Sequence, residues 1–348
     1  MPNPVLTRAI DALASGQDLT ARQSAEVLAE IMAGNASEVQ TAAVLIALRT
    51  KGETVDELIG LATTMRRLAT PVLTSRDDLL DTAGTGGGRP TFNVSTTAAL
   101  IAAGAGCAVA KHGNRSATGL SGSADLLEAL GVRIDLAPAA VSRCIEQIGF
   151  GFMFAPAHHG ATRFVIPVRK ELAVRTIFNF LGPLTNPAGA TRQLIGVSDP
   201  RYLETIAGAL ARLGTRRALV VSSADGLDEM STSGTTRVVE LDAGDLHSYE
   251  VAPADVGLAP AAFDAVAGGT PQANAETTRR ILAGEPGPAR DLAVFNAGAA
   301  ILAGGRAATL EAGVRAAEAA IDSGAAAGAL DALVELTGQL AESGVTTA

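Results

Sequence analysis

Four glycines within five residues form the motif Gly84-Thr85-Gly86-Gly87-Gly88, which follows an apolar run and precedes a helix pattern opening at Asn93. Clustered glycines allow successive backbone N–H groups to point into one concave loop, and the helix N-terminus beyond adds the positive end of a dipole. The motif therefore favours an anion, above all a phosphate. It is not a Walker loop, because no Lys-Ser/Thr pair follows, and its glycine spacing differs from the dinucleotide motif. A tight turn, with Asn93 only capping the helix, is the alternative interpretation.

A second polar motif, Lys111-His112-Gly113-Asn114, comes directly after the apolar run 108–110. Open α/β sheets bind their ligands at the carboxyl ends of parallel strands, which is the position expected here. Lys111 is one of only three lysines in the chain, and an ammonium group binds phosphate or pyrophosphate as a point charge. The alternative is a solvated surface lysine, which leaves the crowding of polar groups beside Gly113 unexplained.

Two further motifs carry candidate partners for charged ligands. Ser123 opens a helix pattern and is a candidate for capping that helix or for binding phosphate, whereas Asp125 has the spacing of a capping-box residue. Arg169, within Pro167-Val168-Arg169, presents a guanidinium fork that suits an organic carboxylate. For Arg169 the alternative is a surface ion pair with Glu171.

Three carboxylates, Asp225, Asp228 and Glu229, lie together just after the apolar run 218–222. Adjacent carboxylates repel one another, so bringing them together requires a cation. Mg²⁺ bound to a polyphosphate suits such a place, because it takes few protein carboxylates and completes its shell from substrate and water. A solvated acidic turn is the alternative.

The elements that must position these residues fall into two groups. Residues 3 to about 69 show apolar side chains at three- and four-residue spacing, which predicts four short helices with Thr54 and either Asn35 or Ser37 as N-caps. Beyond them, short apolar runs alternate with helix-length segments, as in a mostly parallel sheet with crossover helices. The expected strands are Leu79–Thr82, Ala108–Ala110, Val132–Leu136, Gly149–Phe154, Leu194–Val197 and Ala218–Ser222, followed by an antiparallel edge hairpin of Val238–Glu240 and Leu246–Val251.

The segment 157–188 interrupts this alternation with two expected helices, around Val165–Leu172 and Ile177–Leu181. We expect it to pack on the N-terminal helices, so that a ligand cleft lies between two domains. The predicted division is a helical domain of residues 1–72, joined by about 163–188, and an α/β domain of residues 73–162 and 189–348.

Composition restricts the class of protein. The 348 residues suffice for two domains, and the net charge of -9 argues against a nucleic-acid partner. Cys107 and Cys144 lie in apolar runs without a CxxC partner, which predicts buried free thiols in a reducing compartment, the cytoplasm. The start of the chain has no secretory signal pattern, and its most apolar stretch, residues 96–110, is too short for a membrane span.

Taken together, in their order and spacing, these motifs resemble the anthranilate phosphoribosyltransferase family over nearly the whole chain. Any one motif is weak, but the ordered set is specific. The resemblance is carried by residues 84–87, 93–96, 111–116, 121–131, 154–156, 167–169, 175–187 and 225–229.

The resemblance implies an α/β protein with a small all-helical domain and a larger α/β domain, the nucleoside-phosphorylase-like phosphoribosyltransferase architecture with a mostly parallel central sheet. It implies transfer of the phosphoribosyl group from phosphoribosyl pyrophosphate to anthranilate, a step of tryptophan biosynthesis that uses Mg²⁺. A homodimer formed through the helical domain is also implied.

Site residues are carried over from the family by position in this chain. Donor binding is assigned to Gly84, Gly87, Gly88, Thr91, Asn93, Val94, Ser95, Thr96, Lys111 and Ser123. Anthranilate binding is assigned to Gly84, His112, Asn114, Pro156, Arg169 and Gly182, and Mg²⁺ binding to Ser95, Asp228 and Glu229. The expected catalytic residues are Lys111, His112 and Asn114.

One position departs from the family. The family's glycine loop normally ends in Asp where this chain has Gly88, and the stretch from Gly88 to Asn93 is one residue shorter. Loss of a carboxylate beside pyrophosphate and Mg²⁺ is expected to alter metal binding or product release, or to accompany a different aromatic acid as acceptor.

Three other functions are compatible with parts of the pattern. A pyrimidine nucleoside phosphorylase shares the architecture and a glycine-rich phosphate loop, but it uses phosphate and usually carries an additional C-terminal domain, which is not expected here. A non-catalytic paralogue that binds nucleic acid requires a basic cleft and predicts salt-sensitive DNA retention. A scaffold with a vestigial site leaves Lys111 and Arg169 unexplained.

Overall fold

Four amphipathic helices occupy the first 68 residues, as their apolar spacing predicts. The structure is a computed structural model that describes residues 1–116 and 119–343. Ser37, and not Asn35, is the N-cap of the third helix, and Thr54 forms a capping box with Glu57 at the fourth. The helices are α1 (Pro4–Ala14), α2 (Ala21–Met32), α3 (Glu38–Lys51) and α4 (Val55–Leu68).

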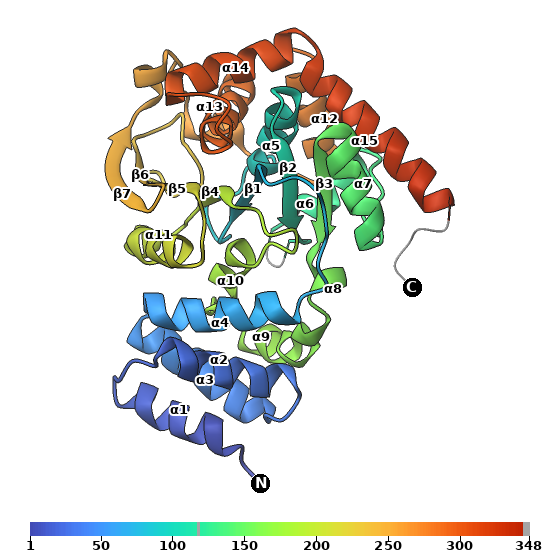
Figure 1. Cartoon of the computed structure of the whole chain (residues 1–348). Coiled ribbons are helices and arrows are strands. Elements are labelled where there is room, and N and C mark those ends of the chain that lie inside the picture. Colours follow the sequence, from blue (N-terminus) through green and yellow to red (C-terminus); the bar gives the residue numbers. More distant parts are fainter. Residues whose placement is uncertain (117–118, 344–348) are drawn as a thin grey trace.

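Seven strands form one sheet in the order β3-β2-β1-β4-β5-β6-β7 (Figure 1). The first five strands run parallel, and β6 and β7 add the expected antiparallel hairpin at one edge. The prediction of a helical domain beside an α/β domain with a mostly parallel sheet is therefore confirmed. The strands are β1 (Leu79–Gly84), β2 (Ala108–Gly113), β3 (Phe150–Phe154), β4 (Arg192–Gly196), β5 (Arg217–Ser223), β6 (Thr236–Asp242) and β7 (Asp245–Val251).

The strand expected at Val132–Leu136 is wrong. The segment between α6 (Ser123–Ala129) and α7 (Pro138–Ile148) belongs to none of the seven strands. Val132, Ile134 and Leu136 are buried, whereas the residues between them are exposed. This alternation resembles a strand in sequence, although the ladder that defines a strand is not formed.

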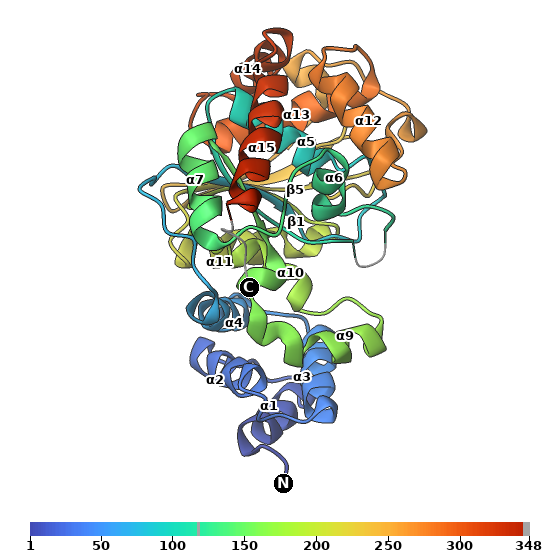
Figure 2. The same cartoon turned by 90° about the vertical axis from the view of Figure 1, so that its right-hand side faces the viewer.

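Helices cover both faces of the sheet (Figures 1 and 2). α5 and α13 pack on one face with the largest apolar core, and α7 and α11 pack on the other. α14 packs on α13, α15 packs on α5, and α12 packs on α6. Besides α6 and α7, the helices around the sheet are α5 (Val94–Gly104), α11 (Leu203–Arg212), α12 (Pro271–Leu282), α13 (Pro288–Ala303), α14 (Leu310–Asp322) and α15 (Ala325–Glu342).

The segment after β3 returns to the N-terminal helices (Figure 2). It comprises α8 (Ala155–His158), η1 (Gly160–Phe164), α9 (Ile166–Leu172) and α10 (Phe178–Leu184). α9 contacts α3 and α10 contacts α4, and their buried side chains share one apolar core with α1 to α4. The exact division at residues 72 and 73 stays a prediction.

Three short 3₁₀ turns complete the fold, namely η2 (Pro200–Tyr202), η3 (Pro253–Val256) and η4 (Phe263–Val266). Within residues 1–116 and 119–343, none of the helices combines the length and the apolarity that crossing a membrane requires.

Candidate active site

The strand order reverses between β1 and β4, which are neighbours in the sheet although they are far apart in the chain. In open α/β sheets a ligand crevice lies outside the carboxyl ends of the strands at such a point. The glycine loop follows β1 here, and the polar motif that starts at Lys111 ends β2. The acidic turn follows β5, two strands away from β1. The sheet thus brings three of the predicted motifs together at the carboxyl ends of its parallel strands.

The glycine loop lies directly on the acidic turn. The backbone N–H of Gly86 donates to Asp228 Oδ2 at 3.1 Å. A Cβ atom placed on Gly84 would lie 2.9 Å from the same oxygen, so a side chain there would displace the carboxylate. Gly86 and Gly87 have φ values of 69° and 83°, the left-handed region that glycine adopts without strain.

Within the described residues, Asp228 and Glu229 form no ion pair, and the positive charges of Arg175 and Lys111 offset their burial only in part. Burial and the charge of Asp228 raise the pKa of Glu229 well above its usual value, and burial raises the pKa of Asp228. Glu229 Oε2 is buried with no hydrogen-bond partner among the described residues. The backbone of Ser95 is hydrogen-bonded to Glu229, which brings the three predicted Mg²⁺ residues together. This cluster fits a divalent cation, which would relieve the repulsion and occupy the free oxygen.

The described residues contain no group of three or more His, Cys, Asp or Glu side chains that could hold a metal alone. A cation at Asp228 and Glu229 would therefore take further oxygens from a substrate or from water, as Mg²⁺ commonly does with polyphosphates.

Lys111 is almost completely buried, with 1% of its surface exposed. Its Nζ donates to the carbonyl oxygen of Thr82 at 2.5 Å and lies 3.1 Å from the hydroxyl of the same residue. Burial lowers the pKa of Lys111 to about 8, against the opposing charges of Asp81 and Glu229. The ammonium is thus buried against Thr82 of β1, close to the site's carboxylates, and does not lie on an open surface.

The α5 N-terminus is fixed by Asn93, which has a left-handed φ of 67°. Asn93 is the N-cap residue of α5 but makes no side-chain capping bond, which disfavours the alternative that it only caps the helix. Its Oδ1 instead accepts from Ser121 Oγ and Asn274 Nδ2, both at 2.8 Å, and its amide donates to the Ser121 carbonyl. The loop before α5 is consequently tied to the loop before α6.

The other residues predicted to bind the donor differ in burial and in the elements that hold them. Val94 and Thr96 are fully buried in α5, and the Thr96 hydroxyl has no hydrogen-bond partner among the described residues. Thr91 lies at an isolated bridge with Ala267. Ser123 begins α6, where Asp125 accepts from the backbone N–H of Gly122 at 2.8 Å and so has the expected capping role.

Two histidines pack together on the acceptor side. The rings of His112 and His159 lie 5.1 Å apart, and His112 Nδ1 is 3.1 Å from the carbonyl oxygen of Gly182. Burial lowers the pKa of His112 to about 3 and that of His159 to about 4, so both rings are neutral at physiological pH. The Nε2 atoms of both rings are buried and unpartnered among the described residues.

Arg169 lies on α9, facing the first turn of α10. Its Nη2 donates weakly to Asn179 Oδ1 at 3.4 Å, and its guanidinium carbon is 5.5 Å from the Phe178 ring centroid. Asn179 in turn approaches the carbonyl of Thr85 at 3.4 Å, which connects this side to the glycine loop. Nε of Arg169 is buried without a partner in the described part of the chain.

Two predicted acceptor residues have other surroundings. Asn114 follows β2, where its Oδ1 accepts from the backbone N–H of Arg115 at 2.7 Å. Pro156 lies in the short helix α8, at the start of the returning segment. The structure gives neither side chain a direct contact with Arg169.

Sequence reasoning missed His159, Arg175 and Asn274 as site residues. Arg175 is exposed, donates to Ser198 Oγ, and lies 3.1 Å from where a Cβ of Gly87 would be. His159 and Asn274 are brought to the site by tertiary packing alone, because each is remote in sequence from its partner. The signal available in the sequence was that Arg175 begins the stretch 175–187, which carries part of the family resemblance.

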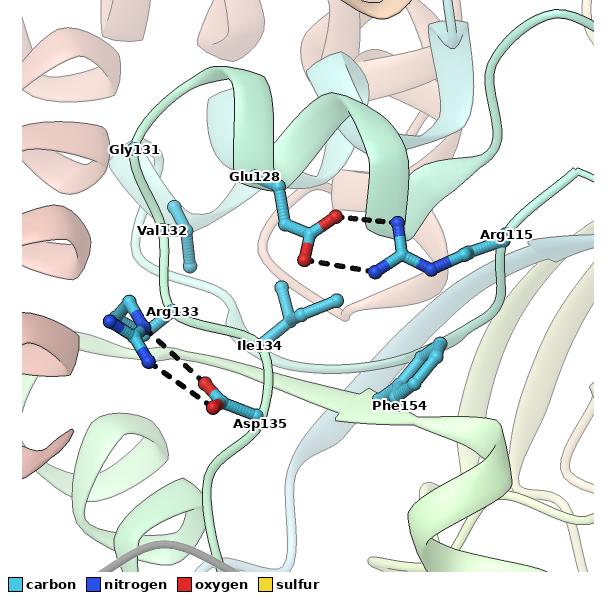
Figure 3. Close-up of a pocket in the computed structure, with 8 residues that line it drawn as sticks. All are labelled: Arg115, Glu128, Gly131, Val132, Arg133, Ile134, Asp135 and Phe154. Atoms are coloured by element: carbon cyan, nitrogen blue, oxygen red, sulfur yellow. Dashed lines mark hydrogen bonds and ion pairs between the residues drawn. The ribbon is translucent and has the colours of Figure 1, made fainter.

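A separate pocket of about 350 Å³ opens beside Phe154 at the end of β3 (Figure 3). Two ion pairs line it, Arg115 with Glu128 and Arg133 with Asp135, together with apolar side chains. None of the predicted site residues lines this pocket, and its charged groups are paired with one another.

Comparison with known proteins places this chain in a family. A sequence profile of the a/b domain of a glycosyl transferase family matches residues 76–327, and its helical bundle domain matches residues 7–69. The anthranilate phosphoribosyltransferase of Moorella thermoacetica is 52% identical over 88% of this chain and 91% of its own length. That of Symbiobacterium thermophilum is 52% identical over 86% of this chain and 88% of its own.

Solved structures agree. The anthranilate phosphoribosyltransferase of Thermus thermophilus has a TM-score of 0.90 and 45% identity, covering 94% of this chain and 99% of its own. The Saccharomyces cerevisiae enzyme in complex with PRPP and Mg has a TM-score of 0.88 and 27% identity, covering 96% and 98%.

Proposed function

The chain belongs to the anthranilate phosphoribosyltransferase family, and we propose that its site transfers the phosphoribosyl group of phosphoribosyl pyrophosphate to anthranilate. The products are N-(5-phosphoribosyl)anthranilate and pyrophosphate, and the step belongs to tryptophan biosynthesis. The observation that carries the proposal is the contact of the glycine loop with Asp228, the neighbour of Glu229, because a Mg²⁺–pyrophosphate donor needs anion-binding amides and carboxylates side by side.

The donor is proposed to lie across the glycine loop and the start of α5. Backbone N–H groups near Gly87 and Gly88 and the α5 N-terminus suit its phosphates. Lys111 adds positive charge beside β1, and its low exposure strengthens the attraction between that charge and a phosphate. The proposed donor site is completed by Gly84, Thr91, Asn93, Val94, Ser95, Thr96 and Ser123.

Mg²⁺ is the proposed cofactor, held by Ser95, Asp228 and Glu229. The Saccharomyces cerevisiae relative is described with PRPP and Mg, and the unpartnered oxygen of Glu229 supports the same use here. When bound, the ion would neutralise the negative charge that develops on the leaving pyrophosphate.

Anthranilate is proposed to bind between α9, α10 and the end of β2. Arg169 has a buried, unpartnered Nε and suits the carboxylate of the acceptor. His112, held by Gly182, presents a neutral ring for packing against the aromatic acid, and Asn114 and Pro156 border its path. His159 belongs to the same surface, because its ring contacts that of His112.

In the proposed reaction the bond from ribose C1 to pyrophosphate breaks while the amine nitrogen of anthranilate attacks C1. The lone pair of an aryl amine is neutral, so no strong base is required before attack, and the proton leaves to water or pyrophosphate afterwards. Lys111 and the loop amides stabilise the leaving group, and Arg169 holds the acceptor close to C1.

The protein is further proposed to be a cytoplasmic homodimer that joins through its helical part. Large apolar side chains are exposed on α3 and on the neighbouring η1–α9 segment, namely Val39, Ile46, Phe164 and Ile166. Such exposure supports a protein interface. Cys107 and Cys144 are both free and buried, which supports a reducing compartment.

Pyrophosphate release tests the proposed reaction. Purified protein with Mg²⁺ and phosphoribosyl pyrophosphate should release pyrophosphate only when anthranilate is added, and a nucleoside with phosphate should give no reaction. Release that requires a different aromatic acid would keep the donor but replace the acceptor. Phosphorolysis of a pyrimidine nucleoside would contradict the proposal.

A further inference from the structure

Arg89 lies where this chain departs from its family, and its side chain joins three segments that are distant in sequence. Its Nη2 donates to Asp225 Oδ2 at 3.0 Å, and its Nη1 donates to the carbonyl oxygen of Phe263. The guanidinium carbon lies 3.4 Å from the centroid of the Phe263 ring, a cation–π contact. The glycine loop, the acidic turn and η4 therefore meet at one side chain.

The ion pair between Arg89 and Asp225 is largely buried, since each side chain is only 12% exposed. Exposed ion pairs contribute little, whereas a hydrogen-bonded pair shielded from water fixes geometry. Asp225 is itself held, because it accepts from Ser231 Oγ at 2.7 Å and from the backbone N–H of Leu227 at 3.2 Å. Arg89 consequently binds a fixed point of the turn.

Backbone N–H groups on both sides of Gly88 hydrogen-bond the glycine loop to the acidic turn. The N–H of Arg89 donates to the carbonyl of Gly226 at 3.1 Å. The N–H of Gly86 donates to Asp228 Oδ2, also at 3.1 Å. The orientation of the Asp228 carboxylate therefore depends on where the loop lies.

Gly88 leaves no room for the aspartate that the family normally has there. A Cβ at this position would lie 2.2 Å from Asp228 Oδ1 and 2.8 Å from the Asp228 backbone nitrogen. An aspartate would add like-charge repulsion to this overlap. In the shorter loop the glycine is required, and the connection between loop and turn is made by the next residue, Arg89.

We propose that Arg89 is a positioning residue for the donor site, which sets the spacing between the loop amides and the Asp228–Glu229 pair. The inference rests on the proposed function, because it assumes that a Mg²⁺–pyrophosphate donor bridges these two groups. Arg89 touches neither the reacting atoms nor the acceptor side, so its effect is confined to donor and metal.

Steady-state kinetics of Arg89→Ala and Asp225→Asn test this role. Arg22→Ala, which removes an arginine from an exposed ion pair far from the loop, is the control. Both test variants should raise the KM for phosphoribosyl pyrophosphate at least tenfold and raise the Mg²⁺ concentration for half-maximal rate. The KM for anthranilate should stay within about twofold of the wild type. Arg89→Lys should recover part of the donor affinity, because it keeps the charge.

The second arm restores the family residue. Gly88→Asp should weaken the use of the donor in this chain, and an improvement would overturn the inference. An unchanged donor KM in folded Arg89→Ala, or an equal rise in the KM of both substrates, would also overturn it. If Arg89→Ala is too unstable to assay, Asp225→Asn decides alone. Absence of activity in the wild type would instead contradict the proposed function.

Discussion

Lys111 donates from Nζ to the carbonyl oxygen of Thr82 at 2.5 Å, which places its charge under the strand that leads into the glycine loop. A lysine on an open surface would lose most of its effect to solvent screening. Buried beside β1, the Lys111 ammonium is shielded from water, and it interacts with the opposite charge of Glu229.

Lys111→Met should lower kcat/KM for phosphoribosyl pyrophosphate about 10- to 100-fold, the range expected for hydrogen bonds to charged groups. The pKa of Lys111 is lowered to about 8 by burial, so its charge is present below that pH and lost above it. The wild-type kcat/KM should therefore fall as pH rises through about 8. Steady-state rates from pH 6.5 to 9.5 check this.

The same pH series with Lys111→Met should be flat in that range, and the exposed Lys170→Met should behave like the wild type. If kcat/KM of Lys111→Met still fell near pH 8, another group would be responsible for the titration.

Glu229→Gln should stabilise the metal-free protein and remove the response to Mg²⁺. Burial and Asp228 raise the pKa of Glu229, so its contribution to folding is present at low pH and lost as pH rises through that raised pKa. The melting temperature of the wild type should thus rise on adding Mg²⁺ and pyrophosphate, more at pH 8 than at pH 5. Thermal unfolding with and without EDTA measures both effects.

The exposed Glu276→Gln provides the control for loss of one carboxylate. An unchanged Mg²⁺ response in Glu229→Gln would mean that the ion binds elsewhere.

Arg169→Ala should raise the KM for anthranilate about 10- to 100-fold while the donor KM stays within about twofold, because a charge-assisted hydrogen bond to the acceptor carboxylate is lost. Initial rates against each substrate separate the two constants. Arg163→Ala, an exposed arginine in the preceding turn, should change neither. Unaltered acceptor kinetics in Arg169→Ala would place the carboxylate elsewhere.

The His112–His159 pair should make the protein sensitive to acid. Burial lowers the pKa of His112 to about 3 and of His159 to about 4, below the ordinary value near 6.5. The unfolded chain then binds more protons between these values, so the free energy of unfolding falls as pH falls below 6.5. The expected loss between pH 7 and 5 is about 2 kcal/mol for each ring.

Urea unfolding at the two pH values measures this loss. His159→Asn should reduce the difference between them, whereas His247→Asn, on the exposed strand β7, should leave it unchanged. An equal pH dependence in all three proteins would assign the sensitivity to other groups.

Local sequence patterns predicted the helices, seven of the eight expected strands and the glycine loop, because each depends on neighbouring residues. The prediction of a strand at Val132–Leu136 failed, because alternating apolar residues indicate burial of one side of a segment and do not show that it pairs with another strand. The burial of Lys111 and the His112–His159 contact could not be predicted, because both depend on how distant segments pack. The resemblance identified Gly88 as unusual, but the reason lies in its contact with Asp228.

Loss of anthranilate fluorescence on mixing purified protein with phosphoribosyl pyrophosphate and Mg²⁺ tests the central claim most directly. We predict a decay that requires protein, donor and metal together and that yields N-(5-phosphoribosyl)anthranilate by mass. A constant signal at saturating donor, from protein that binds phosphoribosyl pyrophosphate by calorimetry, would contradict anthranilate as the acceptor.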